Sequence, residues 1–227
     1  YKGSGFAMGV YDNRYIDFNG ICTDKYLLDK NNETWIRTYL SIPLKGVKIG
    51  IDIAIIMMNP SHADNKKSDK SVNRVIDFFV EENLNNKQKI KKIHILNLFP
   101  ICSPKPKKAY QKLIELYKSN QLLSVMQDNN TKIENIMQKC KYVVLAWGLP
   151  SKSTIPYMYF HQRALIPVKF AKIYEIEMKV FEVSGTTTIL CKTGDPRHPA
   201  GLRGKDIIGL YTLKQEDLFG LGAKMLH

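Results

Sequence analysis

Four short segments of the chain carry the side chains that could do chemistry, and each segment follows an apolar run. They hold amide, imidazole and carboxylate groups, which can position a water, read the hydrogen-bonding edge of a ligand and donate to a leaving group. The residues are Asn59, His62 and Asp64 in the first segment, Asn97 in the second, Trp147 in the third, and Asp195, Arg197 and His198 in the fourth.

The apolar runs before these segments predict the elements that must position them. Ile51 to Met58, Ile93 to Leu98 and Tyr142 to Trp147 are nearly continuous apolar runs, as in strands covered on both faces. Ser68 or Asp69 can cap a helix between the first two strands. This alternation predicts an α/β fold of three layers, with a central, mainly parallel sheet and helices on both faces. Because a ligand site in such a sheet lies outside the carboxyl ends of the strands, we expect the four segments to meet in one crevice.

Weaker patterns predict the remaining elements. Short antiparallel strands or hairpins are expected at Tyr15 to Phe18, Tyr26 to Leu28 and Trp35 to Ile42, further strands at Lys179 to Val183 and Thr187 to Cys191, and helices within 113–137 and 155–165. We expect a single domain over 1–227. Residues 1–50 would form a β-rich extension packed on a core at 51–204, and 205–227 a C-terminal segment.

Cysteine usage and hydropathy argue against metal-binding, membrane-spanning and secreted classes of protein. The four cysteines stand far apart, with no C-x-x-C pair and no His at ligand spacing, so we expect no metal and no cofactor. No apolar run approaches 18 residues and no secretory leader opens the chain. We therefore expect a cytoplasmic protein with no membrane partner and no obligate protein partner.

The net charge is the strongest feature of the composition. An excess of 34 Lys and Arg over 21 Asp and Glu gives +13 and a pI of about 9.5, which favours a polyanionic partner such as double-stranded DNA. Lysines gather on both sides of the second apolar run, at Lys87, Lys89, Lys91 and Lys92 and at Lys105, Lys107 and Lys108. This grouping predicts a basic, DNA-binding face. A generally lysine-rich composition is the alternative explanation.

The four segments also carry a family resemblance. Their sequences, MMNPSHAD, ILNLFP, VVLAWG and TGDPRHP, resemble a family of bacterial and phage domains with the pattern NPS-x-AD, NLF, AWG and G-x-PRHP. In the same order and strand context, they are similar to the uracil-DNA glycosylase superfamily. The resemblance covers about residues 51–204 and implies a uracil-DNA-glycosylase-like fold and base flipping.

The resemblance also implies roles for single residues. Asn59 falls where the superfamily holds the hydrolytic water, Asn97 where the flipped base is read, and His198 where a histidine stabilises the departing base. Asn-Pro-Ser-His replaces the Asp-Pro-Tyr-His of the uracil-specific enzymes, which implies a wider pocket. Such a pocket would suit a bulky modified base, as in phage-defence glycosylases that excise glucosylated bases.

The chemistry of N-glycoside hydrolysis adds candidates, because it needs a fixed water on one face of the sugar and hydrogen-bond donors at the leaving group. Asn59 or Asp64 could hold the water, and Phe99 or Trp147 could stack on the base. His62 is a further candidate for binding the base. Proposed DNA contacts are Arg197, which could instead pair with Asp195, and the wedge candidates Leu202 and Arg203.

Structural explanations stand beside these roles. Asn59 could simply form a turn, Asn97 could cap the following loop, and Trp147 could belong to the core. The leading hypothesis is a monofunctional, metal-independent DNA glycosylase that acts on damaged or phage DNA. The alternatives are a noncatalytic reader of flipped or modified nucleotides, and an enzyme that acts on free nucleosides or nucleotides.

Overall fold

The computed structural model describes residues 9–30, 33–103, 106–149, 155–191, 193–202, 205–214 and 217. Within them the chain forms seven strands, four α-helices and two short 3-10 helices. In chain order the longer elements are β1 (Cys22–Asp29), β2 (Thr34–Pro43), β3 (Ile51–Met57), α1 (Lys70–Asn85), β4 (Ile90–Asn97), α2 (Pro106–Lys118), α3 (Leu122–Met137), β5 (Tyr142–Leu145), α4 (Tyr157–Ile173), β6 (Glu177–Val183) and β7 (Ile207–Thr212).

All seven strands form one sheet in the order β1-β2-β4-β3-β5-β6-β7. The four central strands, β4, β3, β5 and β6, pair in parallel. The chain moves from β3 outward to β4 and then returns to β5 on the other side of β3. The strand order therefore reverses between β3 and β5, the point where open α/β sheets leave a crevice at the carboxyl ends.

The expectation of a mainly parallel sheet is wrong, because the sheet is mixed. The β1–β2 hairpin adds to β4 in antiparallel orientation, and β7 adds to β6 in the same way. Only β1 and β2 are joined by a short turn, which requires antiparallel pairing, whereas the four central strands are linked by helical crossovers that make them parallel. The N-terminal β-rich region is thus part of the sheet.

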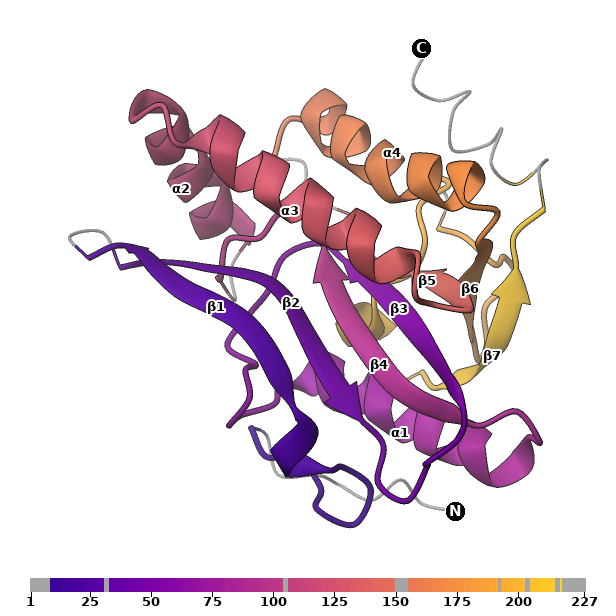
Figure 1. Ribbon diagram of the computed structural model, residues 1–227. Coiled ribbons are helices and arrows are strands. Elements are labelled where there is room, and N and C mark those ends of the chain that lie inside the picture. The colour runs from indigo at the N-terminus through magenta and orange to yellow at the C-terminus, as the bar shows by residue number, and fades with distance from the viewer. Residues whose placement is uncertain are drawn as a thin grey trace.

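Helices cover both faces of the sheet, as the sequence predicts (Figure 1). Helices α2, α3 and α4 lie over one face and α1 lies over the other. Two buried apolar clusters correspond to these layers. One contains Leu113, Ile133 and Phe160 from the three-helix side, and the other contains Val75 and Phe79 from α1. Alternate residues of β3 serve the two clusters, which explains why this strand reads as a continuous apolar run.

The predicted central elements are confirmed, including strands at β3, β4, β5 and β6 and the helix capped by Asp69. Asp69 Oδ1 accepts hydrogen bonds from the backbone N–H groups of Ser71 and Val72. The strand expected at Tyr15 to Phe18 is wrong, because only Ile16 makes a bridge, to Leu44, and a 3-10 helix follows at Phe18–Gly20. The region from 187 to 191 is irregular rather than a strand.

The sequence does not predict strand β7, because Gly209 interrupts its short apolar run and its side chains are only partly buried.

In the described part of the chain, no helix combines the length and apolar character that crossing a membrane requires.

Candidate functional site

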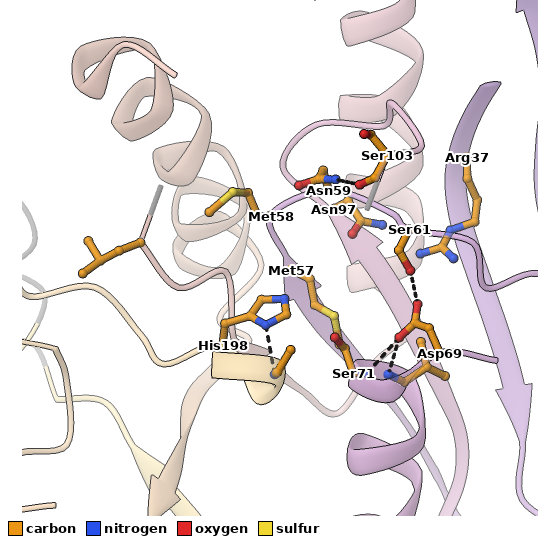
Figure 2. Close-up of a pocket in the computed structure, with 13 residues that line it drawn as sticks. Arg37, Met57, Met58, Asn59, Ser61, Asp69, Ser71, Asn97, Ser103 and His198 are labelled. Carbon is orange, nitrogen blue, oxygen red and sulfur yellow. Dashed lines mark hydrogen bonds between the residues drawn. The ribbon is translucent and has the colours of Figure 1, made fainter. Parts of the chain in front are cut away.

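A cavity of about 380 Å³ opens at the carboxyl ends of β3 and β4, within the ~300–1,000 Å³ range of small-molecule clefts. Figure 2 shows side chains from β2, β3, β4, the start of α1 and the loop before η2 (Pro199–Leu202) converging on it. The lining comprises Arg37, Met57, Met58, Asn59, Ser61, Asp69, Ser71, Val72, Asn97, Ser103, Leu149, His198 and Ala200. Three residues singled out from the sequence, Asn59, Asn97 and His198, therefore share one cavity.

Asn97 presents the least satisfied polar group in this cavity. It ends β4 and its side chain is fully buried, yet neither Nδ2 nor Oδ1 has a hydrogen-bond partner among the described residues. A buried amide without partners costs about 1–3 kcal/mol for each unsatisfied group. A ligand that both accepts from Nδ2 and donates to Oδ1 would remove this cost. Among the residues that the structure describes, no hydrogen bond from the Asn97 side chain supports its alternative role as a cap of the following loop.

A buried clamp fixes the backbone that carries Asn97. Asn129 on α3 donates from Nδ2 to the Asn97 carbonyl oxygen at 3.0 Å. Arg163 on α4 donates from Nε and Nη2 to the Leu98 carbonyl oxygen, and from Nη2 to Asn130 Oδ1 at 2.7 Å. Because these donors occupy the carbonyls, the end of β4 is held from the three-helix face while the Asn97 side chain is left to the cavity.

Asn59 is oriented by the loop beyond β4. Its Nδ2 donates to the Ser103 carbonyl oxygen at 2.6 Å and to the Pro60 carbonyl oxygen at 3.2 Å. The Ser103 N–H returns a bond to the Pro60 carbonyl at 2.8 Å, which ties the two loops together. Since both contacts use the amide nitrogen, Oδ1 remains as an acceptor that could hold a water.

His198 accepts a backbone hydrogen bond, which fixes the tautomer of its neutral ring. The Ala200 N–H donates to its Nδ1 at 3.1 Å, so the proton of the neutral ring belongs on Nε2. Burial lowers the pKa of His198 to about 4, although the nearby charge of Asp69 acts in the opposite direction. Near neutral pH the ring can therefore donate from Nε2 without carrying a charge.

Several contacts position the loop that carries His198. The Gly148 N–H donates to the Pro196 carbonyl oxygen, and Arg74 on α1 donates to the Pro199 carbonyl oxygen at 2.8 Å. The buried carboxylate of Asp195 accepts from Trp147 Nε1 at 3.3 Å. The third and fourth segments of the sequence are thus joined by hydrogen bonds, as expected for loops that meet at one edge of the sheet.

Two of the lining residues carry charge that sequence reasoning did not assign to the site. Asp69 caps α1, and its Oδ2 accepts a very short hydrogen bond from Ser61 Oγ. Arg37 lies in β2, is 1% exposed, and donates from Nη1 to the Ala63 carbonyl oxygen at 2.5 Å. A charged residue within the apolar run from Trp35 to Ile42 was the signal that could have identified Arg37.

Asp64 and His62 do not line the cavity. Asp64 pairs with Lys25 Nζ at 2.9 Å and accepts from the backbone N–H groups of Lys66 and Lys67. Burial raises the pKa of Asp64, but these hydrogen bonds outweigh it and hold the pKa below its usual value. The carboxylate thus organises its own loop, while His62 is exposed.

The two stacking candidates are core residues. Phe99 is fully buried and its ring packs 5.7 Å from that of Tyr159, and Trp147 is 1% exposed within the same apolar cluster. Neither ring lines the cavity. The structural explanation given for Trp147 is therefore the one that the geometry supports, and it extends to Phe99.

Some of the residues predicted to contact DNA are exposed, one is buried, and two lie outside the described residues. Lys107 and Lys108 are exposed in the first turn of α2. Arg197 donates from Nη2 to Thr188 and to the Leu190 carbonyl oxygen. Leu202 is 6% exposed and packs in the core on the α1 side, so it is not presented as a wedge. Lys105 and Arg203 lie outside the described residues.

The two groups of lysines do not form one face. Lys89, Lys91 and Lys92 lie at the start of β4, whereas Lys107 and Lys108 follow its end. The eight residues of β4 span about 25 Å at the rise of an extended strand, which separates the groups across the sheet. Only the second group is near the carboxyl-end loops that form the cavity.

No group of three or more His, Cys, Asp or Glu side chains within the described ranges is arranged to hold a metal ion. The cavity itself offers amides, hydroxyls, one guanidinium, one imidazole and one carboxylate. These groups can hydrogen-bond a polar organic ligand, hold a water and stabilise charge on a leaving group.

Comparison with known proteins places the chain in a family. The chain matches none of the curated proteins and none of the solved structures with which it was compared. Residues 46–200 match the family described as "Protein of unknown function (DUF1643)". All four motif segments fall inside this stretch, which is more than half of the chain. The chain therefore belongs to the DUF1643 family.

Proposed function

We propose that the protein is a monofunctional DNA glycosylase with a uracil-DNA-glycosylase-like fold, which flips a damaged or modified base into the cavity and leaves an abasic site. The observation that carries the proposal is the convergence of Asn59, Asn97 and His198 on one cavity at the carboxyl edge of the sheet. Repair of damaged DNA or defence against phage DNA is the proposed setting.

Asn97 would read the flipped base. Its amide carries two donors and an acceptor, which match the mixed donor and acceptor pattern of a base's Watson-Crick edge. Its lack of partners in the described structure supports this role, because a base would supply the missing hydrogen bonds. The clamp from Asn129 and Arg163 would keep the amide in place before the base arrives, so little ordering is needed on binding.

His198 would act on the leaving base. As the glycosidic bond breaks, its electron pair passes to the base, and Nε2–H of the neutral ring donates a hydrogen bond to the oxygen or nitrogen that gains negative charge. Donors of this kind contribute on the order of 10²–10³ in rate. Protonation of the released base by solvent then completes the departure.

Asn59 Oδ1 would hold the attacking water. The water oxygen bonds to C1′ of the sugar as the base leaves, and its extra proton passes to solvent. The sugar gains positive charge in the oxocarbenium-like transition state. Asp69 would stabilise this charge, since it is the carboxylate in the cavity lining. In this proposal Asp69 takes the place expected for Asp64.

The size and chemistry of the cavity favour a modified base. About 380 Å³ is available, and Ser61 stands where the uracil-specific enzymes that this loop resembles carry a bulky tyrosine. A glucosylated, hydroxymethylated pyrimidine is one candidate of the right bulk. The oxygens of its substituent would face the hydroxyls and the guanidinium at the β2 side of the cavity.

The test is abasic-site formation in duplex DNA. The protein would be incubated with unmodified, uracil-containing, hydroxymethylated and glucosylated duplexes, and alkali-labile breaks and released bases would be measured. We expect cleavage of at least one modified duplex, a loss of at least ~10²-fold in Asn59→Ala and His198→Ala, and normal activity in the exposed control His62→Ala. Full activity in both cavity variants would show that these roles are wrong.

One observation favours a noncatalytic reader as the second candidate. The Asp69 carboxylate accepts hydrogen bonds from Ser61, Ser71 and Val72, and Asp64 is outside the cavity, so among the described residues no uncommitted carboxylate lines the cavity as a base. A reader would bind a modified duplex tightly and release nothing. An enzyme that acts on free nucleosides would instead show little salt dependence of duplex binding.

A further inference from the structure

Arg37 is a buried cation without an ion-pair partner among the described residues. Its side chain is 1% exposed, and within the described part of the chain its guanidinium makes one hydrogen bond, from Nη1 to the Ala63 carbonyl oxygen. Nε is buried and has no partner. A buried guanidinium needs a counter-charge and hydrogen-bond acceptors, because removing the charge from water is strongly unfavourable.

The two carboxylates whose charges act on Arg37, Asp69 and Asp64, are engaged elsewhere. Asp64 is paired with Lys25, which compensates its charge. Asp69 accepts from Ser61 Oγ and from the N–H groups of Ser71 and Val72 at the N-terminus of α1. A helix N-terminus also offsets negative charge. Neither carboxylate therefore supplies the acceptors that the guanidinium lacks.

The guanidinium faces the cavity rather than the core. Arg37 and Asn97 line the same pocket, and Figure 2 shows the Arg37 side chain extending from β2 toward Ser61, on the side of the pocket away from His198. A ring held by Asn97 would therefore have one side toward His198 and another toward Arg37. Two unsatisfied side chains, Arg37 and Asn97, thus point to one ligand.

The geometry points to an oxyanion subsite at Arg37, so that the ligand of this cavity carries a carboxylate or phosphate group beside the ring that Asn97 binds. The planar fork of arginine matches these groups, since two parallel N–H donors can bind two oxygens. The oxyanion could come from an acidic substituent on the base or from the phosphate of the nucleotide. The inference rests on the proposed function for the identity of the ring.

The first test uses the unmodified protein and matched ligands. Calorimetry would compare 5-carboxyuracil with uracil-5-carboxamide, which has the same shape without the charge, and deoxyuridine with its 5′-monophosphate; a cytosine series would run in parallel. We expect the charged member of one pair to bind ~10-fold more tightly or better. Preference in the first pair identifies a substituent on the base, and preference in the second identifies the phosphate.

Variants then assign the preference to Arg37. Arg37→Met should abolish it, and Arg37→Lys should keep only part of it, because lysine retains the charge without the fork. Arg14→Met, which removes an exposed arginine paired with Asp12, should leave it unchanged. If Arg37→Met does not fold, the matched ligands on the unmodified protein still decide the question.

Equal affinities within both pairs, or no binding of any carboxylate or phosphate at millimolar concentration, would overturn the subsite. This result is separate from the fate of the proposed function. Charge-selective binding without abasic-site formation would support the oxyanion subsite and contradict the proposed glycosylase activity. Abasic-site formation without charge-selective binding would support the glycosylase activity and contradict the subsite.

Discussion

Gly148 and His198 are in such close contact that a Cβ atom built on the glycine would lie 2.6 Å from the Cβ atom of His198. Gly148 also has a φ of +69°, a conformation that residues with a side chain rarely adopt. The position thus requires glycine for two independent reasons, and the second of them concerns the imidazole at the cavity.

Gly148→Ala should therefore displace His198 as well as strain the backbone. We expect a loss of about 1–2 kcal/mol in the free energy of unfolding from the backbone term, and in addition a loss of ligand binding or activity. Gly46→Ala is the matched control, since Gly46 has a φ of +80° and nothing within 4 Å of the added carbon. Equal behaviour of the two variants would contradict a role for the contact with His198.

Replacement of Asn129 should loosen the end of β4. Asn129→Leu and Asn129→Asp both remove the donor to the Asn97 carbonyl, and we expect each to lower the free energy of unfolding by about 1–3 kcal/mol in urea titrations. Gln127→Leu, at an exposed position of the same helix, should stay within ~0.5 kcal/mol of the unmodified protein. Unchanged stability in Asn129→Asp would show that the clamp is not needed.

His198 should make stability depend on pH below neutrality. Its pKa is 6.5 ordinarily and about 4 in the folded protein. Between these values the unfolded chain binds a proton that the folded protein does not, so the free energy of unfolding falls as the pH drops from 6.5 to 4 and is unaffected above 6.5. Because the side chain is partly exposed, we expect a loss of about 2 kcal/mol rather than the full value.

The measurement is a set of urea titrations from pH 4 to pH 8 on the unmodified protein and on His198→Gln. The variant should lack this part of the pH dependence, whereas contributions from other histidines should be common to both proteins. Parallel profiles would mean that the imidazole is not held neutral in the folded state.

Asp77 should make stability depend on pH in the opposite direction to His198, so that the free energy of unfolding decreases as the pH rises. Burial, with the charges of Glu81 and Asp12, raises its pKa from 3.8 to about 7. The folded protein thus holds a proton that the unfolded chain loses, and the associated stability, complete below pH 3.8, is lost as the pH rises through 7. Asp77→Asn should then raise the free energy of unfolding by about 1–2 kcal/mol at pH 8 and by little at pH 4.

A control for Asp77 is Asp128→Asn, which neutralises an exposed carboxylate on α3 and should change stability by less than ~0.5 kcal/mol at either pH. If Asp77→Asn raises the free energy of unfolding equally at pH 4 and pH 8, titration of Asp77 is not the cause of the increase.

The two lysine groups should contribute unequally to duplex binding. If DNA lies over the carboxyl edge of the sheet, Lys107→Ala combined with Lys108→Ala should reduce the slope of log K against log salt by about 1–2. Lys91→Ala combined with Lys92→Ala makes the same change in charge at the far end of β4 and should leave the slope unaltered. The reverse pattern would place the DNA on the opposite edge.

Periodicity predicted the central strands and helices well because their apolar faces are complete. Burial on both faces made β3, β4 and β5 continuous apolar runs, and Asp69 gave a clear helix start. The flanking antiparallel strands were harder to assign, because partly buried residues such as those of β7 weaken the pattern. The orientation of β1, β2 and β7 depends on connection geometry, which periodicity does not contain.

The cavity was only partly predictable. The rule that sites lie at the carboxyl ends of strands selected Asn59, Asn97 and His198 correctly as neighbours, because strand order fixes where those ends lie. It could not separate Asp64 from Asp69, which are five residues apart in one loop and differ in the direction of the side chain. Arg37 escaped because it comes from an antiparallel strand, to which the rule does not apply.

The family match begins at residue 46, whereas Arg37 belongs to a strand that ends at Pro43. A fragment trimmed to the matched residues would therefore lose one wall of its own cavity and expose the edge of β4 that β2 now covers. For this chain, the stretch that matches the family is therefore shorter than the stretch that builds the cavity. Recombinant truncations should start upstream of the β1–β2 hairpin if they are to keep this wall.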